Sequence, residues 1–391
     1  MYKKYKNQII YFVVLVFSFL FIITLPYNLD KAAPQWSDQF FDSDVFRVIE
    51  NLRNSDLHPQ SRSTAHPLYP LFAVSAAKIS SLFGFKDLEF VFYKTIFGTM
   101  GFFLFWLYIY KTKNLLTAFS ALILLMSTMT VRVWTTVPET FLFGFFTLML
   151  ALNAARLRYN LFFIVICSFS GTITNSFFGI FYSIKKINNI KKYLYFALQT
   201  ILIILGLVIL QKNIYPSATH FFDPGRIFRD LVYFNINLNI IPYRFFDFFF
   251  SGFVIPLSGS ANNFPLNTYD IWKNFFIFER GIRPNLAIYS SILILSFLIF
   301  FSILNLIKKN KKNVLDSTIY AFIFFQFVLH MIYGYTPFLY SYHFLPFLII
   351  IATNQNFKYS IILPAIFILL SLCIQEVNIA HYGETFRFFF L

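Results

Sequence analysis

Two aspartates, Asp42 and Asp44, stand close together in the segment QFFDSDVFRVIENL at residues 39–52. A carboxylate can act as a general base that takes a proton from an attacking hydroxyl group. Aspartate also caps helices, because its oxygens accept hydrogen bonds from the first backbone N–H groups. Two carboxylates this close do not both cap one helix, so we expect one of them to be available for chemistry. The residues leave open which one caps and which one reacts.

Three arginines have the type and place in the sequence to contact a phosphate group, since a guanidinium can form two parallel hydrogen bonds to it. Arg132 falls in the predicted outer turn TVRVWTTVPE, and Arg280 and Arg283 fall in FERGIRPN. Structural roles fit equally well: Arg132 can snorkel to lipid headgroups beside Trp134, and Glu279 can pair with one of the other two arginines. Both roles stay open at this point.

These residues belong to a chain that is too apolar to fold around one soluble core. It has 391 residues, of which 58% are hydrophobic and only 13% are charged. Uncharged runs of about 20 residues recur, the length that crosses a bilayer as a helix. We therefore predict an all-α polytopic membrane protein with a single integral membrane domain over residues 1–391. The first run, near residues 9–25, lacks a small-residue cleavage site and is interpreted as an uncleaved span.

Basic residues lie in short clusters between the apolar runs, where they indicate the cytoplasmic ends of spans. Pairing the spans between these clusters predicts an N-terminus inside and a C-terminus outside. The net charge of +15 then reflects orientation, and nucleic acid is not an expected partner. About eleven spans are predicted near residues 9–25, 90–110, 115–131, 139–155, 160–174, 175–184, 193–211, 285–307, 316–334, 343–354 and 359–375. Residues 171–184 are too short for a straight span and suggest a broken or re-entrant pair.

This topology places the chemistry on the outer face, in two long external segments at residues 26–89 and 212–284. All of the 17 acidic residues except Asp316 fall outside, and so do most of the arginines, whereas most lysines fall inside. Two interfacial helices are predicted in the first segment. Apolar residues at i, i+3, i+4 and i+7 predict one within SDVFRVIENLRN, and HPLYPLFAVSAAKISSLFG at residues 66–84 predicts the other.

The order of these features resembles the GT-C superfamily of polyprenyl-phosphate-sugar-dependent glycosyltransferases, near the protein mannosyltransferases and aminoarabinose transferases. The resemblance rests on a first span, an external acid before an amphipathic helix, the element HPLYPLF, and VPETFLFGFFTLMLAL. It covers residues 1–190 well and the remainder in architecture only. In that superfamily an essential aspartate of the first loop is often followed four residues later by an aromatic residue. Asp42 and Phe46 have this spacing, and Asp44 is the second choice.

The resemblance also implies roles for residues elsewhere in the chain. His66 looks like the histidine of a His-Pro-Pro-Leu element, and Glu139 looks like the acid of a Pro-acid pair that positions an acceptor or a metal. Relatives often have Arg-Tyr before a proline at a late outer span end, where this chain has Tyr342 and His343. His343 or an arginine of the second loop is then expected to bind phosphate. The plainer alternatives are a loop histidine packed on its neighbours and a polar residue at a span end.

The implied activity is transfer of a sugar from a polyprenyl-phosphate donor to a glycan, lipid or protein acceptor. It would take place at the external, periplasmic side of a bacterial cytoplasmic membrane, with an aspartate as base and cations stabilising the lipid phosphate. A divalent cation can be placed among Asp42, Asp44, Glu139 and His66, but no compact ligand spacing demands one. The two cysteines lie far apart in apolar runs and indicate neither a disulfide framework nor a metal site.

Two other functions stay open. A lipid-linked saccharide flippase or transporter would have charged or broken helices at the bilayer midplane and internal repeats, and no convincing repeat is found. An O-antigen polymerase or ligase would use a late external loop rich in arginine. That alternative rests on Arg226, Arg229, Arg244, Arg280 and Arg283.

Overall fold

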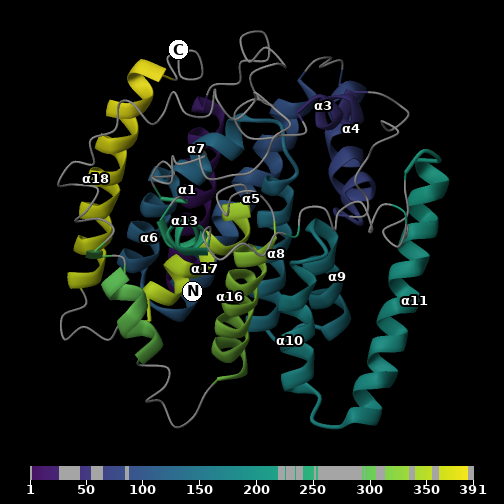
Figure 1. Ribbon diagram of the computed structural model, residues 1–391. Coiled ribbons are helices and arrows are strands. Elements are labelled where there is room, and N and C mark those ends of the chain that lie inside the picture. The colour runs from purple at the N-terminus through teal and green to yellow at the C-terminus, as the bar shows by residue number, and fades with distance from the viewer. Residues whose placement is uncertain are drawn as a thin grey trace.

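The computed structural model of the chain describes residues 2–25, 45–53, 65–83, 88–218, 225, 234, 241–250, 252–253, 293–294, 296–304, 313–333, 340–354 and 361–385. Helices make up nearly all of these residues (Figure 1). Within the same ranges, the β-pairing is limited to an isolated antiparallel bridge between Phe234 and Tyr333. The predicted all-α fold is therefore confirmed for the described residues.

The helices follow one another along the whole chain. Those of the first half are α1 (Tyr2–Thr24), α3 (Val45–Arg53), the π-helix η1 (Pro70–Val74), α4 (Ser75–Leu82), α5 (Glu89–Thr112), α6 (Leu115–Ser127), α7 (Met129–Thr136), α8 (Phe141–Arg156), α9 (Leu161–Gly171) and α10 (Ser176–Lys186). Those of the second half are α11 (Ile190–Ile214), α13 (Ile241–Phe250), α16 (Val314–Ile332), α17 (Ser341–Ala352) and α18 (Ile362–Thr385).

Four of the described helices are long and apolar enough to cross a membrane, and they lie in α1, α5, α11 and α16. The pair α6 and α7 qualifies as a fifth, although its two helices meet at 61°. Helices α8, α9 and α17 are apolar but shorter. Such helices are those of an all-α membrane protein, and the total of about eleven spans stays a prediction.

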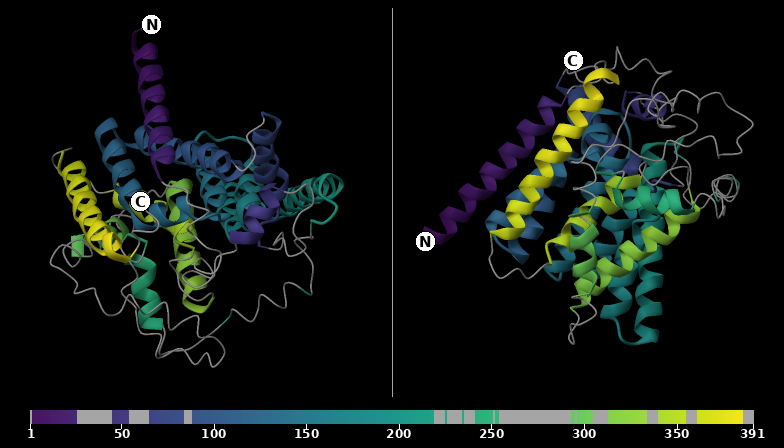
Figure 2. Two further views of the ribbon diagram at one scale, coloured as in Figure 1. Left: turned by 90° about the horizontal axis from the view of Figure 1, so that it is seen from above. Right: turned by 60° about the vertical axis from the view of Figure 1, so that its left-hand side comes forward.

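Helix α5 is central to the bundle and packs against α1, α4, α6 and α8. Helix α8 in turn packs against α9 and α17, while α10 lies between α9 and α16. Helices α11 and α18 stand at opposite edges of the molecule (Figures 1 and 2). The lysine-rich connection from α10 to α11 lies at the opposite end from α3 (Figure 1). The two ends of the bundle therefore differ in charge as the predicted topology requires.

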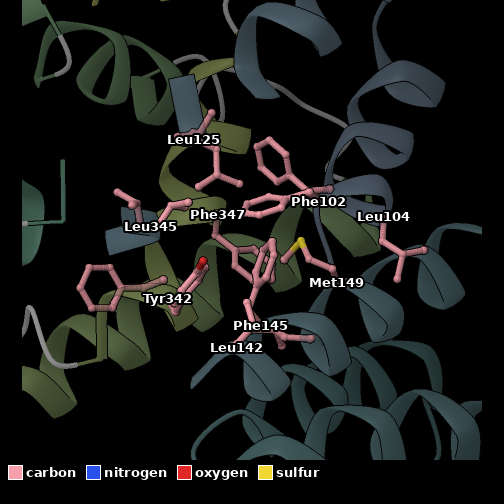
Figure 3. Packing of buried hydrophobic residues seen from close by; sticks show 14 of the residues in the cluster. Phe102, Leu104, Leu125, Leu142, Phe145, Met149, Tyr342, Leu345 and Phe347 are labelled. Atoms are coloured by element: carbon pink, nitrogen blue, oxygen red, sulfur yellow. The ribbon is translucent and has the colours of Figure 1, made fainter. Parts of the chain in front are cut away.

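The core where α5, α8 and α17 meet is filled with large apolar side chains (Figure 3). Phe145 of α8 lies between Phe102 of α5 and Tyr342 of α17, with ring centroids 5.5 Å and 5.1 Å apart. One polar side chain joins the helices here, since the Nδ2 of Asn153 donates to the Leu104 carbonyl at 2.9 Å. Because lipid is as apolar as these side chains, close packing and such hydrogen bonds hold helices together within a membrane.

The prediction of a single straight span over residues 115–131 was wrong. Helix α6 ends at Ser127, and Thr128 has an extended backbone that starts α7 in a new direction. The Thr128 hydroxyl accepts the N–H of Val131, which is how an N-cap residue begins a helix. Arg132 consequently lies within helix α7, at intermediate exposure, and not in a turn.

The predicted helices of the first external segment are present. Helix α3 begins directly after Asp44 and buries Val48 and Leu52, two residues of the predicted apolar stripe. Residues 70–82 are helical, first as η1 and then as α4. Helix α3 packs against η1, α4 and α5, so the start of α3 is held beside the segment that follows His66.

The predicted break within residues 171–184 is also present. Helices α9 and α10 have 11 residues each and pack against each other, with the turn at residues 172–175 between them. Each is about 16 Å long, roughly half the thickness of the hydrocarbon core of a bilayer. The hairpin therefore brings its turn to the middle of the bundle, beside the start of α8.

Candidate functional site

His66 is held by hydrogen bonds at both ring nitrogens. Its Nδ1 lies 2.8 Å from the carbonyl oxygen of Gly171, and its Nε2 lies 2.9 Å from the hydroxyl of Thr140. A carbonyl only accepts, so Nδ1 carries the proton, and in the neutral ring Nε2 accepts from Thr140. The N–H of Ile173 also donates to the carbonyl of Ala65 at 3.1 Å. The α9–α10 turn thus fixes both the ring and the backbone at His66.

The start of α8 gathers further polar groups around a buried acid. Glu139 is 4% exposed, and its Oε2 accepts the N–H of Thr140 at 3.0 Å, where a negative charge favours the helix N-terminus. Tyr93 of α5 donates its hydroxyl to the Glu139 carbonyl at 3.0 Å and accepts the N–H of Phe143 at 3.2 Å. These bonds orient Thr140 toward His66.

Tyr69 connects this region to α3 through electrostatics. Burial and then the nearby Glu139 carboxylate raise the pKa of Tyr69, while Arg47 of α3 acts in the opposite direction. The phenol therefore stays protonated. Its ring meets that of His66 edge-on, with centroids 6.5 Å apart. The helix that follows Asp42 and Asp44 thus presents a cation close to the groups around His66.

His343 enters the same region from α17. It is 1% exposed, and its Nε2 has no hydrogen-bond partner among the described residues. A Cβ atom on Gly144 would lie 2.7 Å from this nitrogen and 3.6 Å from the Nδ2 of Asn175. The absence of a side chain at Gly144 is therefore what lets the imidazole and the amide approach the first turn of α8.

Asn175 lies in the α9–α10 turn and is fully buried. It occupies the position before α10 where an asparagine side chain usually caps a helix, but it makes no capping bond. Neither its Oδ1 nor its Nδ2 has a hydrogen-bond partner in the described part of the chain. Together with His66, Glu139, Thr140 and His343 it forms what we call the polar cluster.

Gln211 of α11 fixes the segment that follows His66. Its Oε1 accepts the N–H of Leu71 at 3.2 Å, and its Nε2 donates to the carbonyl of Pro67 at 3.1 Å. In a regular α-helix these two backbone groups would bond to each other. The amide of Gln211 is inserted between them, beside a π-helix of the kind often found at functional sites.

Arg244 of α13 approaches the cluster from the other side. It is 3% exposed, and its Nη1 donates to the carbonyl of Met331 at the end of α16, at 2.9 Å. Burial lowers the pKa of Arg244, and the nearby Tyr340 acts in the opposite direction. The rings of Tyr340 and His343 both lie against Phe141, at centroid distances of 6.0 Å and 5.7 Å. An arginine is therefore present close to the late span end, although the local sequence YSYHFLP lacks one.

The structure brings together three of the predicted site residues, His66, Glu139 and His343. Tyr342 lies in the core, where its hydroxyl bonds to that of Thr135 at 2.7 Å. Arg132 lies on α7, outside the contacts that join the cluster as described above. Four predicted residues, Asp42, Asp44, Arg280 and Arg283, lie outside the described residues. Their roles stay predictions.

Sequence reasoning missed Thr140, Asn175 and Gln211. Polar residues inside apolar runs, as in TITNS and VILQKN, were the available signal, because such residues are rare in spans without a function. As for a metal, no three His, Cys, Asp or Glu side chains converge within the described residues, a search that does not reach Asp42 and Asp44.

Comparison of the chain with protein families, with curated protein sequences and with solved structures gave no match.

Proposed function

We propose that the protein is a membrane glycosyltransferase that transfers a sugar from a polyprenyl-phosphate donor to an acceptor at the outer face. The observation that carries this proposal is the convergence of His66, Glu139 and His343. These residues come from three distant parts of the chain, and the resemblance to the GT-C superfamily implied a role for each. Structural packing alone gives no reason for them to meet in one polar cluster within an apolar bundle.

The catalytic carboxylate in this proposal is Asp42 or Asp44. Helix α3 begins at Val45 and packs against η1, and its Arg47 influences Tyr69 beside the polar cluster. The carboxylate would take the proton of an acceptor hydroxyl, whose oxygen then bonds to the anomeric carbon of the sugar. The bond from that carbon to the phosphate oxygen breaks, and polyprenyl phosphate leaves.

The leaving phosphate gains negative charge, so a cation at that position lowers the barrier. Arg280 and Arg283 were predicted for this role from the sequence. Arg244 supports it from the structure, because its guanidinium is buried close to Tyr340 at the late span end. We include Arg244 among the residues proposed to contact the donor phosphate.

The test is a transfer assay with purified protein in detergent or nanodiscs, using polyprenyl phosphates that carry different sugars. Asp42→Asn and Asp44→Asn remove each carboxylate with little change in shape, and one of them should lower the rate by about 100-fold or more. Asp316→Asn, in the first turn of α16 at the lysine-rich end, is the matched control and should keep full activity. If wild type transfers no sugar from any donor, the proposal is wrong.

A second candidate is a flippase for a lipid-linked saccharide. The bent pair α6–α7 and the half-length hairpin α9–α10 favour it, because broken helices with polar turns often line the substrate site of a transporter. Proteoliposomes that hold a fluorescent lipid-linked sugar separate the two candidates. Movement of the intact lipid between leaflets supports the flippase, and release of polyprenyl phosphate supports the transferase.

A further inference from the structure

Asn175 has no structural role that explains its amide group. Its side chain is fully buried, does not cap α10, and has neither donor nor acceptor bonded within the described residues. The turn is closed by other groups instead, since the Asn175 N–H donates to the Thr172 hydroxyl at 3.1 Å and the Ser176 hydroxyl donates to the Ile173 carbonyl. A buried amide without partners destabilises a fold, so its presence needs another explanation.

A second unpartnered group lies nearby, on a different element. The Nε2 of His343 is buried and without a hydrogen-bond partner in the described part of the chain. Both His343 and Asn175 approach Gly144 at the first turn of α8. Two polar side chains from α17 and from the α9–α10 turn thus converge with their hydrogen-bonding capacity unused.

We propose that Asn175 and His343 bind hydroxyl groups of the donor sugar, and that this sugar is neutral. An amide offers two donors and an acceptor, and a neutral imidazole offers one of each, which suits vicinal hydroxyls. Neither side chain neutralises a charge, so an acidic or cationic sugar gains less here than a neutral hexose or pentose. This inference rests on the proposed glycosyltransferase function and assigns the part of the site that recognises the sugar.

The key variant is Asn175→Leu, which keeps the shape of the side chain and removes its polar atoms. If the amide serves only binding, this variant has the same or a higher melting temperature, since an unsatisfied buried group is lost. Asn160→Leu is the matched control. Asn160 caps the other end of the hairpin by accepting the Phe162 N–H at 2.9 Å, so its loss should lower the melting temperature and leave binding unchanged.

The probes are polyprenyl phosphates that carry glucose, mannose or galactose, and bare polyprenyl phosphate. Binding to full-length protein in detergent is followed by intrinsic tryptophan fluorescence. Asn175→Leu should weaken binding of the sugar that wild type prefers by about tenfold. Binding of bare polyprenyl phosphate should stay within about twofold, because the phosphate and lipid contacts are untouched.

The outcomes separate the two proposals. Loss of affinity for both probes to the same extent, or for neither, overturns the role of Asn175 while the transferase function stands. Wild-type protein that binds no sugar-bearing donor more tightly than bare polyprenyl phosphate overturns the sugar site directly. Failure to transfer sugar in the separate activity assay overturns both. If Asn175→Leu does not fold, Asn175→Ala is measured with the same probes and the same criteria.

Discussion

Gly144 and His343 are in such close contact that no larger residue fits between them. The Nε2 of His343 would lie 2.7 Å from a Cβ atom on Gly144, below the closest approach of real side chains. The same glycine also meets the end of α9, since a Cβ atom on Gly171 would lie 2.7 Å from the Gly144 Cα. Two helices and one catalytic-site candidate therefore depend on the same bare backbone.

Gly144→Ala should accordingly displace the His343 ring and destabilise the protein by about 1–3 kcal/mol, the usual range for overpacking. Chemical unfolding in detergent measures this change. Gly206→Ala is the matched control, because nothing lies within 4 Å of a Cβ atom there. Alanine in the middle of α11 should stabilise the protein by up to about 1 kcal/mol. Equal effects at both glycines would refute the close contact.

The insertion of Gln211 between Pro67 and Leu71 predicts a second difference. Gln211→Leu leaves a buried N–H and a buried carbonyl without partners, which should destabilise the protein by about 1–3 kcal/mol. Gln199→Leu on the same helix, at a partly exposed position, is the control and should change stability by less than about 0.5 kcal/mol. Indistinguishable unfolding curves for the two variants would contradict the inserted amide.

The hydrogen bond from Thr140 to His66 predicts a hydroxyl requirement. Thr140→Val keeps the shape but leaves the His66 Nε2 unpaired, so we expect lower stability by about 1 kcal/mol and slower sugar transfer. Thr140→Ser retains the hydroxyl and should recover most of both properties. A serine variant that behaves like the valine variant would show that the methyl group, rather than the hydrogen bond, is what matters.

The predicted odd number of spans is testable without any substrate. A reporter active only in the cytoplasm should work when inserted at Asn188, in the lysine-rich connection between α10 and α11. The same reporter fused after residue 391 should be inactive, because the C-terminus is predicted outside. Activity at both places would make the span count even and move the second half of the topology.

Helix positions were largely predictable because apolar runs and clustered lysines mark where spans begin and end. The α9–α10 break was also visible, since GTITNS interrupts two runs that are each too short to span. The bend at Thr128 was not, because one N-cap threonine looks like any threonine in an apolar segment. Contacts such as Gln211 to Pro67 join residues far apart in sequence, and no local pattern predicts their meeting.

The same holds for the polar cluster. His66, Glu139 and His343 were found through a resemblance, whereas Asn175 was overlooked because an asparagine before a helix is ordinarily a cap. Only its burial and its missing partners distinguish it from a cap. The function of such a residue depends on what it does not contact, and that property cannot be read from its neighbours in sequence.

The bond pair made by Gln211 also limits how the chain can be divided. A fragment that stops before α11 would contain His66, Glu139 and Asn175, but the amide that holds Pro67 and Leu71 would be missing. Split versions should therefore be cut after α11, and a fragment library screened for folding should show its first stable N-terminal piece only once residue 211 is included. Membrane insertion of the nascent chain can then begin early, while the segment around His66 is completed late.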